Sequence, residues 1–86
     1  MPQYEIVFVR TARKELEALA HTISARILKK VESLALNPRP SDNKKLHGHS
    51  SLFRIRVGVY RVIYIIDDDR KVVDAAIVRH RSDAYR

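Results

Sequence analysis

One stretch of the sequence restricts the possible folds more than any other. Leu52–Val57 and Tyr60–Ile66 are rich in β-branched and aromatic residues, and they are joined at Gly58-Val59. Two such runs around a two-residue turn predict an antiparallel β-hairpin. Val72–Val78 is a third run of this kind and follows the polar turn DDDRK. We therefore expect three antiparallel strands that follow one another along the chain.

The N-terminal half supplies one further strand and two helices. Tyr4–Val9 is apolar on most of both faces, which is typical of an inner strand. Thr11 is a candidate helix cap, and two apolar stripes with helical spacing follow it, separated by a break near His21-Thr22. The stripes are Ala12, Leu16, Leu19 and Ala20, then Ile23, Ile27, Val31 and Leu34. Pro38 disfavours helical geometry in the residue before it, so the second helix is expected to end at about Leu36.

This order of elements, strand-helix-helix-strand-strand-strand, predicts an α+β fold. A two-helix hairpin is expected to pack on one face of a four-stranded, mostly antiparallel sheet and to leave the other face open. The 86 residues suffice for one small core, so residues 1–86 are expected to form a single domain.

Composition narrows the possible functions. No apolar run approaches the roughly 20 residues that span a bilayer, and no signal-peptide pattern follows Met1, so a cytoplasmic protein without a membrane partner is expected. The absence of cysteine excludes disulfides and thiol nucleophiles. Seventeen Lys and Arg against ten Asp and Glu give a net charge of +7. Such a charge is typical of a protein that binds a polyanion or an acidic partner, although solubility alone also accounts for it.

The arginines of the hairpin are expected on the open face of the sheet. Alternate residues of a strand face opposite sides, so Arg54 and Arg56 lie away from the apolar side of their strand. A two-residue turn pairs Val57 with Tyr60 and places Arg56 opposite Arg61. Directly opposed like charges lower stability. This arrangement of two arginines therefore makes physical sense if an anion binds between them.

Arg79 joins this set if the next turn pairs Ile66 with Val72, whereas a register shifted by one residue would move it to the other face. Lys44 and Lys45 are expected on the loop beside this side of the sheet. The simpler alternative is a solvated face of charged residues, which is common in half-covered sheets. The segment from Arg54 to Arg61 has three arginines and no acid, and this favours an anion site because solvated faces usually mix charges.

Other candidate motifs are weak. His47 and His49 lack the further ligands that a zinc site needs, and Asp67–Asp69 is more simply a solvated turn, so no metal is expected. There is no G-x-S-x-G elbow and no glycine-rich phosphate loop, so no nucleotide cofactor is expected either. His80 and Tyr85 fit a solvated or packing role as well as a catalytic one.

Three segments together resemble the RelE/ParE superfamily of bacterial and archaeal toxins. They are KKLHG at Lys44–Gly48, LFRIRVGVYRVIY at Leu52–Tyr64 and RHRSDAY at Arg79–Tyr85. The resemblance covers almost the whole chain and implies a RelE-like fold. It also implies a toxin neutralised by a cognate antitoxin, in most RelE-like members a ribosome-dependent endoribonuclease that cuts mRNA in the A site without a metal. Some relatives instead poison DNA gyrase and cut no RNA.

The resemblance also implies roles for individual residues. Arg61 matches an arginine that holds the scissile phosphate, and Arg79 matches one that stabilises charge in the transition state. Arg54 and Arg56 match basic positions that are often lysine, and because arginine stays protonated in proteins they fit charge stabilisation better than general-base catalysis. The general base is therefore unassigned.

Three further assignments come from the C-terminal motif and the loop. His80 matches a position with an acid/base role in several relatives, and imidazole suits proton transfer near neutral pH. Tyr85 matches a tyrosine that stacks on or orients the mRNA base. Lys44, Lys45 and Arg81 are expected to bind RNA or the ribosome. A plain RNA-binding module without catalysis and a ParE-like gyrase poison are the alternatives.

Overall fold

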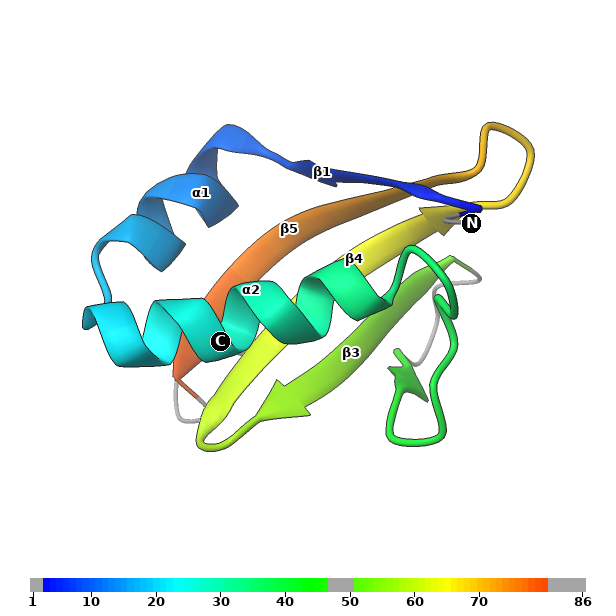
Figure 1. The fold of residues 1–86 in the computed structure, drawn as a ribbon. Coiled ribbons are helices and arrows are strands. Elements are labelled where there is room, and N and C mark those ends of the chain that lie inside the picture. The colour runs from blue at the N-terminus through cyan, green and yellow to red at the C-terminus, as the bar shows by residue number, and fades with distance from the viewer. Residues whose placement is uncertain (1–2, 47–50, 81–86) are drawn as a thin grey trace.

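The computed structural model describes residues 3–46 and 51–80 and has the predicted order of helices and main strands (Figure 1). The elements are β1 (Glu5–Phe8), α1 (Arg10–Glu17), α2 (His21–Ser33), β2 (Lys44–Lys45), β3 (Leu52–Val57), β4 (Tyr60–Asp67) and β5 (Val72–His80). The two helices lie on one face of the sheet, as expected (Figure 1). The predicted α+β fold is confirmed.

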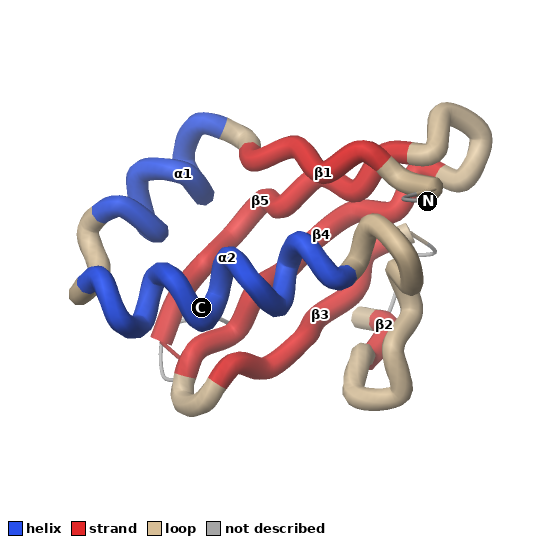
Figure 2. Tube along the Cα trace, viewed as in Figure 1, coloured by secondary structure: helices blue, strands red, loops and turns tan. Residues whose placement is uncertain are grey.

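The sheet has five strands in the order β1-β5-β4-β3-β2, one more than predicted. The additional strand is β2, which pairs antiparallel with the start of β3 and lies at the sheet border (Figure 2). β1 is parallel to β5 and forms the opposite border, so the prediction of an inner strand is wrong. The apolar residues of β1 are half-buried, because Ile6 and Phe8 pack against the core.

The core lies between the helices and the sheet. The fully buried side chains include Ile27 and Val31 of α2, Ile55 of β3, and Val62 and Tyr64 of β4. The apolar stripe predicted for the second helix therefore faces the sheet. The first helix begins at Arg10 rather than after Thr11, and its N-cap residue Val9 makes no side-chain capping bond.

The pairing of β4 with β5 contains a bulge that the sequence did not reveal. At the turn, Ile66 pairs with Val73, which is shifted by one residue from the predicted Ile66–Val72 pair. Between the pairs Ile63–Ile77 and Tyr64–Ala75, β5 carries one extra residue, and this shifts the register again. Two shifts of one residue restore the original facing of side chains, because strand faces alternate with a period of two.

The long connection between α2 and β3 is held in place by side chains. The buried Tyr64 hydroxyl donates a hydrogen bond to the Pro38 carbonyl oxygen at 2.8 Å and accepts one from Asn43 Nδ2 at 3.1 Å. Burial raises the pKa of the Tyr64 phenol, which keeps it a neutral donor. Arg39 binds Asp68, in the β4–β5 turn, through two hydrogen bonds of 3.2 and 2.9 Å. No helix in the described part of the chain is long and apolar enough to cross a membrane.

Candidate anion-binding site

Three arginines form a row across neighbouring strands at the end of the sheet where β3 turns into β4. Arg56 of β3 pairs directly with Arg61 of β4, and Arg61 pairs with Arg79 of β5. Directly paired residues of antiparallel strands project to the same face. We call these residues the arginine row. The pairing of Arg56 with Arg61 confirms the predicted hairpin register, and Arg79 lies on the predicted face because the bulge compensates for the shifted turn.

Arg61, at the centre of the row, is buried. Its relative exposure is 9%, and it is the charged side chain that is buried among the described residues, on the sheet face opposite to the hydrophobic core. Its Nη1 donates to the Tyr60 carbonyl oxygen at 3.3 Å, whereas its buried Nε finds no hydrogen-bond partner among the residues described. A buried cation with an unused donor lowers stability, so another contribution must favour arginine at this position.

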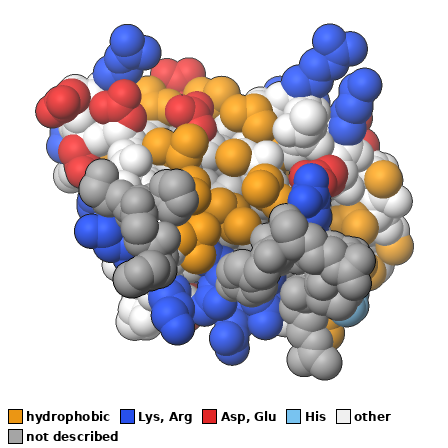
Figure 3. Space-filling view, turned by 180° about the vertical axis from the view of Figure 1, so that it is seen from behind, with side chains coloured by type: hydrophobic (Ala, Val, Ile, Leu, Met, Phe, Trp, Pro, Cys, Tyr) orange, Lys and Arg blue, Asp and Glu red, His pale blue; other side chains and the backbone are white. Residues whose placement is uncertain are grey.

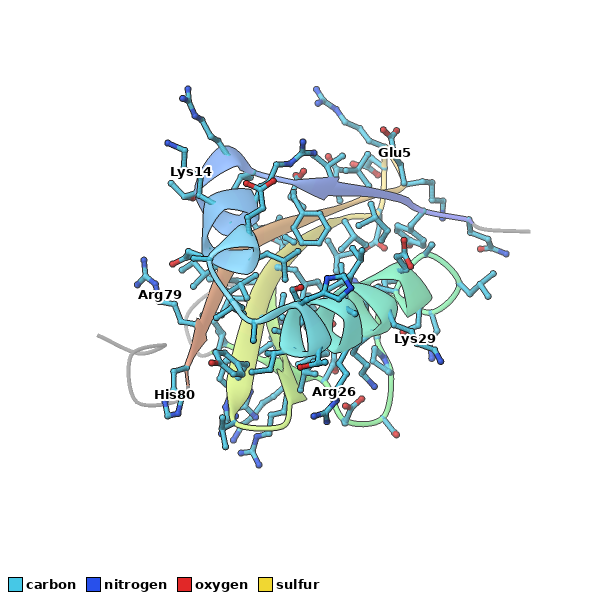
Figure 4. All side chains as sticks on the ribbon, turned by 60° about the vertical axis from the view of Figure 1, so that its left-hand side comes forward. Glu5, Lys14, Arg26, Lys29, Arg79 and His80 are labelled. Atoms are coloured by element: carbon cyan, nitrogen blue, oxygen red, sulfur yellow. The ribbon has the colours of Figure 1, made fainter. Side chains whose placement is uncertain are left out.

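Arg79 is the member of the row with a carboxylate partner. Its Nε donates to Oε2 of Glu15 in α1 at 2.7 Å, and Oε1 of the same carboxylate accepts a hydrogen bond from the Val78 backbone N–H at 3.0 Å. The side chain remains 43% exposed. Figure 4 shows Arg79 and His80 near the end of β5.

The other predicted basic residues lie beside the row. Arg54 is half-buried and pairs with Ile63, so it shares the face of Arg56 and Arg61. Lys44 pairs with Arg54 and lies on that face too, whereas Lys45 pairs with Phe53 and lies on the face that the helices cover. Both lysines are exposed and belong to β2 rather than to a loop.

His80 is not on the face of the arginine row. It pairs with Tyr60, and the two rings meet edge to face with centroids 5.6 Å apart. It is exposed at the end of β5, next to Arg79 in the chain. Tyr85 and Arg81, and the histidines His47 and His49, lie outside the described residues. Within residues 3–46 and 51–80, no group of three His, Asp or Glu residues is arranged to hold a metal ion.

The open face carries its charge unevenly. Figure 3 shows this face, with Lys and Arg side chains gathered along its lower border and apolar side chains in the middle. Ile65, which is 37% exposed, lies on this face. The site therefore combines a basic border with an apolar surface next to it.

A basic groove between α2 and β3 was missed by the sequence analysis. It has a volume of about 480 Å³, and Arg56 lines it together with Arg26 and Lys29 of α2. Lys30, a further cation of its lining, is paired with Asp42 at 3.1 Å. The sequence does contain a signal for this groove, because Arg26 and Lys29 are three residues apart beside the apolar stripe of the helix and so lie on one side of it.

Comparisons with known proteins identify the family of this chain. The family model described as "ParE toxin of type II toxin-antitoxin system, parDE" matches residues 6–85. The chain belongs to the RelE/ParE toxin superfamily. Among curated RelE-type toxins, Toxin RelG of Mycobacterium tuberculosis is 32% identical over 84 residues, which cover 96% of this chain and 97% of RelG.

Solved RelE structures have the same fold. The archaeal RelE–RelB complex from Pyrococcus horikoshii matches with a TM-score of 0.83 and 30% identity, over 95% of this chain and 99% of that one. The isolated RelE toxin of E. coli matches with a TM-score of 0.82 and 27% identity, over 95% and 88% of the two chains. This protein is therefore a RelE-type toxin of a toxin–antitoxin system.

Proposed function

We propose that this RelE-type toxin is a ribosome-dependent endoribonuclease that cuts mRNA in the A site. The observation that carries the proposal is the arginine row, in which a buried arginine stands between two others on adjacent strands. The phosphate of an RNA backbone is the anion that such a row fits, because arginine donors match phosphate oxygens in pairs.

The reaction would use the nucleophile that RNA itself carries. The 2′-hydroxyl oxygen attacks the adjacent phosphorus, a P–O2′ bond forms, and the P–O5′ bond breaks. One proton leaves the 2′-hydroxyl and another reaches the 5′-oxygen, which gives a 2′,3′-cyclic phosphate and a 5′-hydroxyl. Negative charge grows on the phosphate oxygens and on O5′ during the step. Arg61 is assigned to the scissile phosphate, and Arg79 to the leaving oxygen and the transition-state charge.

Arg54 and Arg56 are assigned to further charge stabilisation, and His80 to proton transfer. The ring of His80 is on the opposite face of β5 from the row, against Tyr60. His80 directly follows Arg79 at the end of β5. Its imidazole suits proton transfer near neutral pH. Tyr85 is assigned to the mRNA base, and Lys44, Lys45 and Arg81 to contacts with RNA or the ribosome.

The need for a ribosome follows from what the row lacks. Arginines neutralise charge but do not move protons, and no carboxylate other than Glu15 is bonded to the described residues of the row. Much of the rate must then come from holding the 2′-hydroxyl in line with the phosphate, and a substrate already fixed in the ribosomal A site meets this requirement. No metal or cofactor has a role in this mechanism.

The experiment is to add purified toxin to ribosomes programmed with an mRNA and to map the products. We expect cuts within the A-site codon, ends that carry a 2′,3′-cyclic or 3′-phosphate, and no cleavage of the same mRNA without ribosomes. Cleavage should survive EDTA at concentrations that leave ribosomes intact. Intact mRNA together with DNA breaks in cells that express the toxin would replace this function with gyrase poisoning.

A cognate antitoxin with an acidic segment is the second partner that we propose. The related archaeal RelE was solved in complex with RelB. This chain has a net charge of +7, and its open face also exposes the apolar side chain of Ile65. Since a partner that binds the folded state raises its stability, the complex should melt at a clearly higher temperature than the free toxin. An unchanged melting temperature on adding the antitoxin encoded beside the gene would contradict this.

A further inference from the structure

A carboxylate from α1 binds the part of the β5 edge that is nearest to the arginine row. β1 pairs with β5 only as far as Phe8 and Ala75, and the chain then turns into α1. Beyond that point the Val78 N–H has no strand partner, and Glu15 Oε1 accepts its hydrogen bond at 3.0 Å. The other oxygen of Glu15 holds Arg79 Nε at 2.7 Å. One side chain therefore ties together a helix, a strand edge and a member of the row.

These two bonds restrict the guanidinium of Arg79. The guanidinium is planar and carries five N–H donors in a fixed arrangement. Glu15 binds the donor on Nε, and neither terminal nitrogen of Arg79 is bonded to a residue that the structure describes. Because Glu15 is itself fixed by the Val78 N–H, the direction of the Arg79 side chain is set by the backbone of β5. Among the described residues, nothing else binds the terminal nitrogens, which suits them to bind a phosphate.

Stability alone explains this pair poorly. The side chains of Arg79 and Glu15 are 43% and 24% exposed, and ion pairs with this degree of exposure contribute little. A carboxylate at this place also reduces the positive charge that attracts a phosphate. The pair makes sense if the orientation of Arg79 matters more than the total charge of the row, since charge stabilisation in catalysis depends on donors that are already in place.

We propose that Glu15 is a positioning residue that orients Arg79 toward the phosphate. The proposal rests on the function proposed above, and it adds a residue that does not touch the substrate. Removing Glu15 should therefore lower the cleavage rate and leave ribosome affinity almost unchanged.

The experiment compares Glu15→Ala and Glu15→Gln with Glu17→Gln, which removes the same charge from an exposed position of the same helix. In single-turnover cleavage on programmed ribosomes, Glu15→Ala should be about 10- to 100-fold slower than wild type, the usual range for groups that orient a functional residue. Glu15→Gln retains an acceptor for the Val78 N–H but does not accept both bonds, so its loss should be smaller. Glu17→Gln should cleave at the wild-type rate.

A double substitution separates positioning from a general loss of structure. If Glu15 acts through Arg79, adding Glu15→Ala to Arg79→Ala should slow cleavage no further, whereas independent roles would multiply the two losses. Nitrogen-15 NMR supplies a readout that needs no activity, because the Arg79 Nε–H resonance should shift in Glu15→Gln while the amides of the central strands keep their positions. Cleavage by Glu15→Ala at the wild-type rate, or multiplied losses, would overturn the proposal. A wild-type protein that does not cleave would instead remove the proposed function and this inference with it.

Discussion

The arginines near the two ends of the central strands differ in their partners. Where β4 ends and β5 begins, Arg39 binds Asp68 through two hydrogen bonds, and the Tyr4 hydroxyl donates to the same carboxylate at 2.6 Å. At the other end, where β4 begins and β5 ends, the arginine row has Glu15 as its acid among the described residues. Within the described residues, Arg39 is paired with an acid at one end of the strands, the matched end, whereas Arg79 is the member of the arginine row that binds a carboxylate at the other end.

This contrast fits a stabilising site at one end and the proposed phosphate-binding site at the other. The hydrogen bonds from Arg39, and then that from Tyr4, lower the pKa of the Asp68 carboxyl to about 2 from its ordinary value near 3.8. The folded state thus favours the charged form of Asp68. In the row, three cations on adjacent strands repel one another, and the buried member leaves a donor unused. Such an arrangement is stabilised when an anion arrives, which is what a phosphate-binding site requires.

The largest effect is expected from Arg79→Ala. Removing one strong donor to the transition state typically lowers a rate about 100- to 1,000-fold, and the loss should appear in single-turnover cleavage rather than in ribosome affinity. The side chain is 43% exposed, so the fold should survive its truncation. Cleavage by the variant at the wild-type rate would show that Arg79 has no such role and would make His80 and Arg61 the leading candidates.

Lys44→Ala is the matched control for Arg79→Ala. Lys44 is exposed at the border of the same face, where it is assigned to docking. Its loss should weaken ribosome association more at low salt than at high salt, while bound complexes cleave at the wild-type rate. If Lys44→Ala slows the bound complex as strongly as Arg79→Ala does, the division between chemistry and docking is wrong.

Arg61→Met tests whether the arginine row, unlike the Arg39–Asp68 pair, serves activity rather than stability. The substitution should lower activity and leave stability intact. Cleavage should fall about 100-fold through loss of the phosphate contact. The free energy of unfolding should stay equal or rise by about 1 kcal/mol, since an apolar chain replaces a buried cation with an unused donor. Urea unfolding followed by circular dichroism measures this difference.

Arg39→Met is the control at the other end of the strands and should lower stability. It removes two parallel hydrogen bonds to Asp68, which also accepts one from Tyr4, and a bidentate pair of this kind stabilises even an exposed site more than the single bond from Arg79 to Glu15 does. The two substitutions would then change the free energy of unfolding in opposite directions, or Arg39→Met alone would lower it. A clear destabilisation by Arg61→Met would mean that the row contributes to the fold and would remove the contrast between the two ends.

The sequence predicts contacts between residues that are close along the chain better than contacts between distant ones. Arg56 and Arg61 flank a two-residue turn, so local rules fixed their pairing correctly. Arg79 was placed on the right face, but the assumed Ile66–Val72 pair does not exist, and the bulge in β5 supplies the true reason. Nothing in the local pattern of that strand distinguishes a bulge from regular pairing.

The contacts that join distant segments were not predictable. Glu15 and Arg79 are 64 residues apart, and their contact depends on where α1 lies relative to β5. The same holds for Arg39 and Asp68. The inner position expected for β1 was wrong because an apolar strand at a sheet border can also pack against the core, as the half-buried Ile6 and Phe8 do. The charge of a segment can be read directly from its residues, whereas the residue that it contacts depends on the whole fold.

Tyr64→Phe tests how the long connection is held at the matched end. It removes the hydroxyl that bonds to Pro38 and Asn43 and leaves the buried Pro38 carbonyl without its partner. We expect a loss of about 1 to 2 kcal/mol in unfolding free energy, which corresponds to roughly 5 to 10 °C in melting temperature for a domain of this size. Tyr4→Phe, which removes a hydroxyl bonded at the surface, should cost less. Equal losses would mean that burial of the Tyr64 hydroxyl has no special effect.

The smallest effect is a pH dependence that belongs to Asp68. Its carboxyl pKa is lowered on folding, so its contribution to stability is complete above the ordinary value near 3.8 and disappears as the pH falls toward about 2. The difference in melting temperature between wild type and Asp68→Asn should therefore be constant above about pH 5 and shrink between about pH 4 and pH 2. Asp69→Asn removes the same charge from the same turn and controls for the protein's net charge. If the Asp68→Asn difference does not shrink over this range, the bond between Arg39 and Asp68 does not stabilise the folded state, and the matched end of the strands loses its electrostatic explanation.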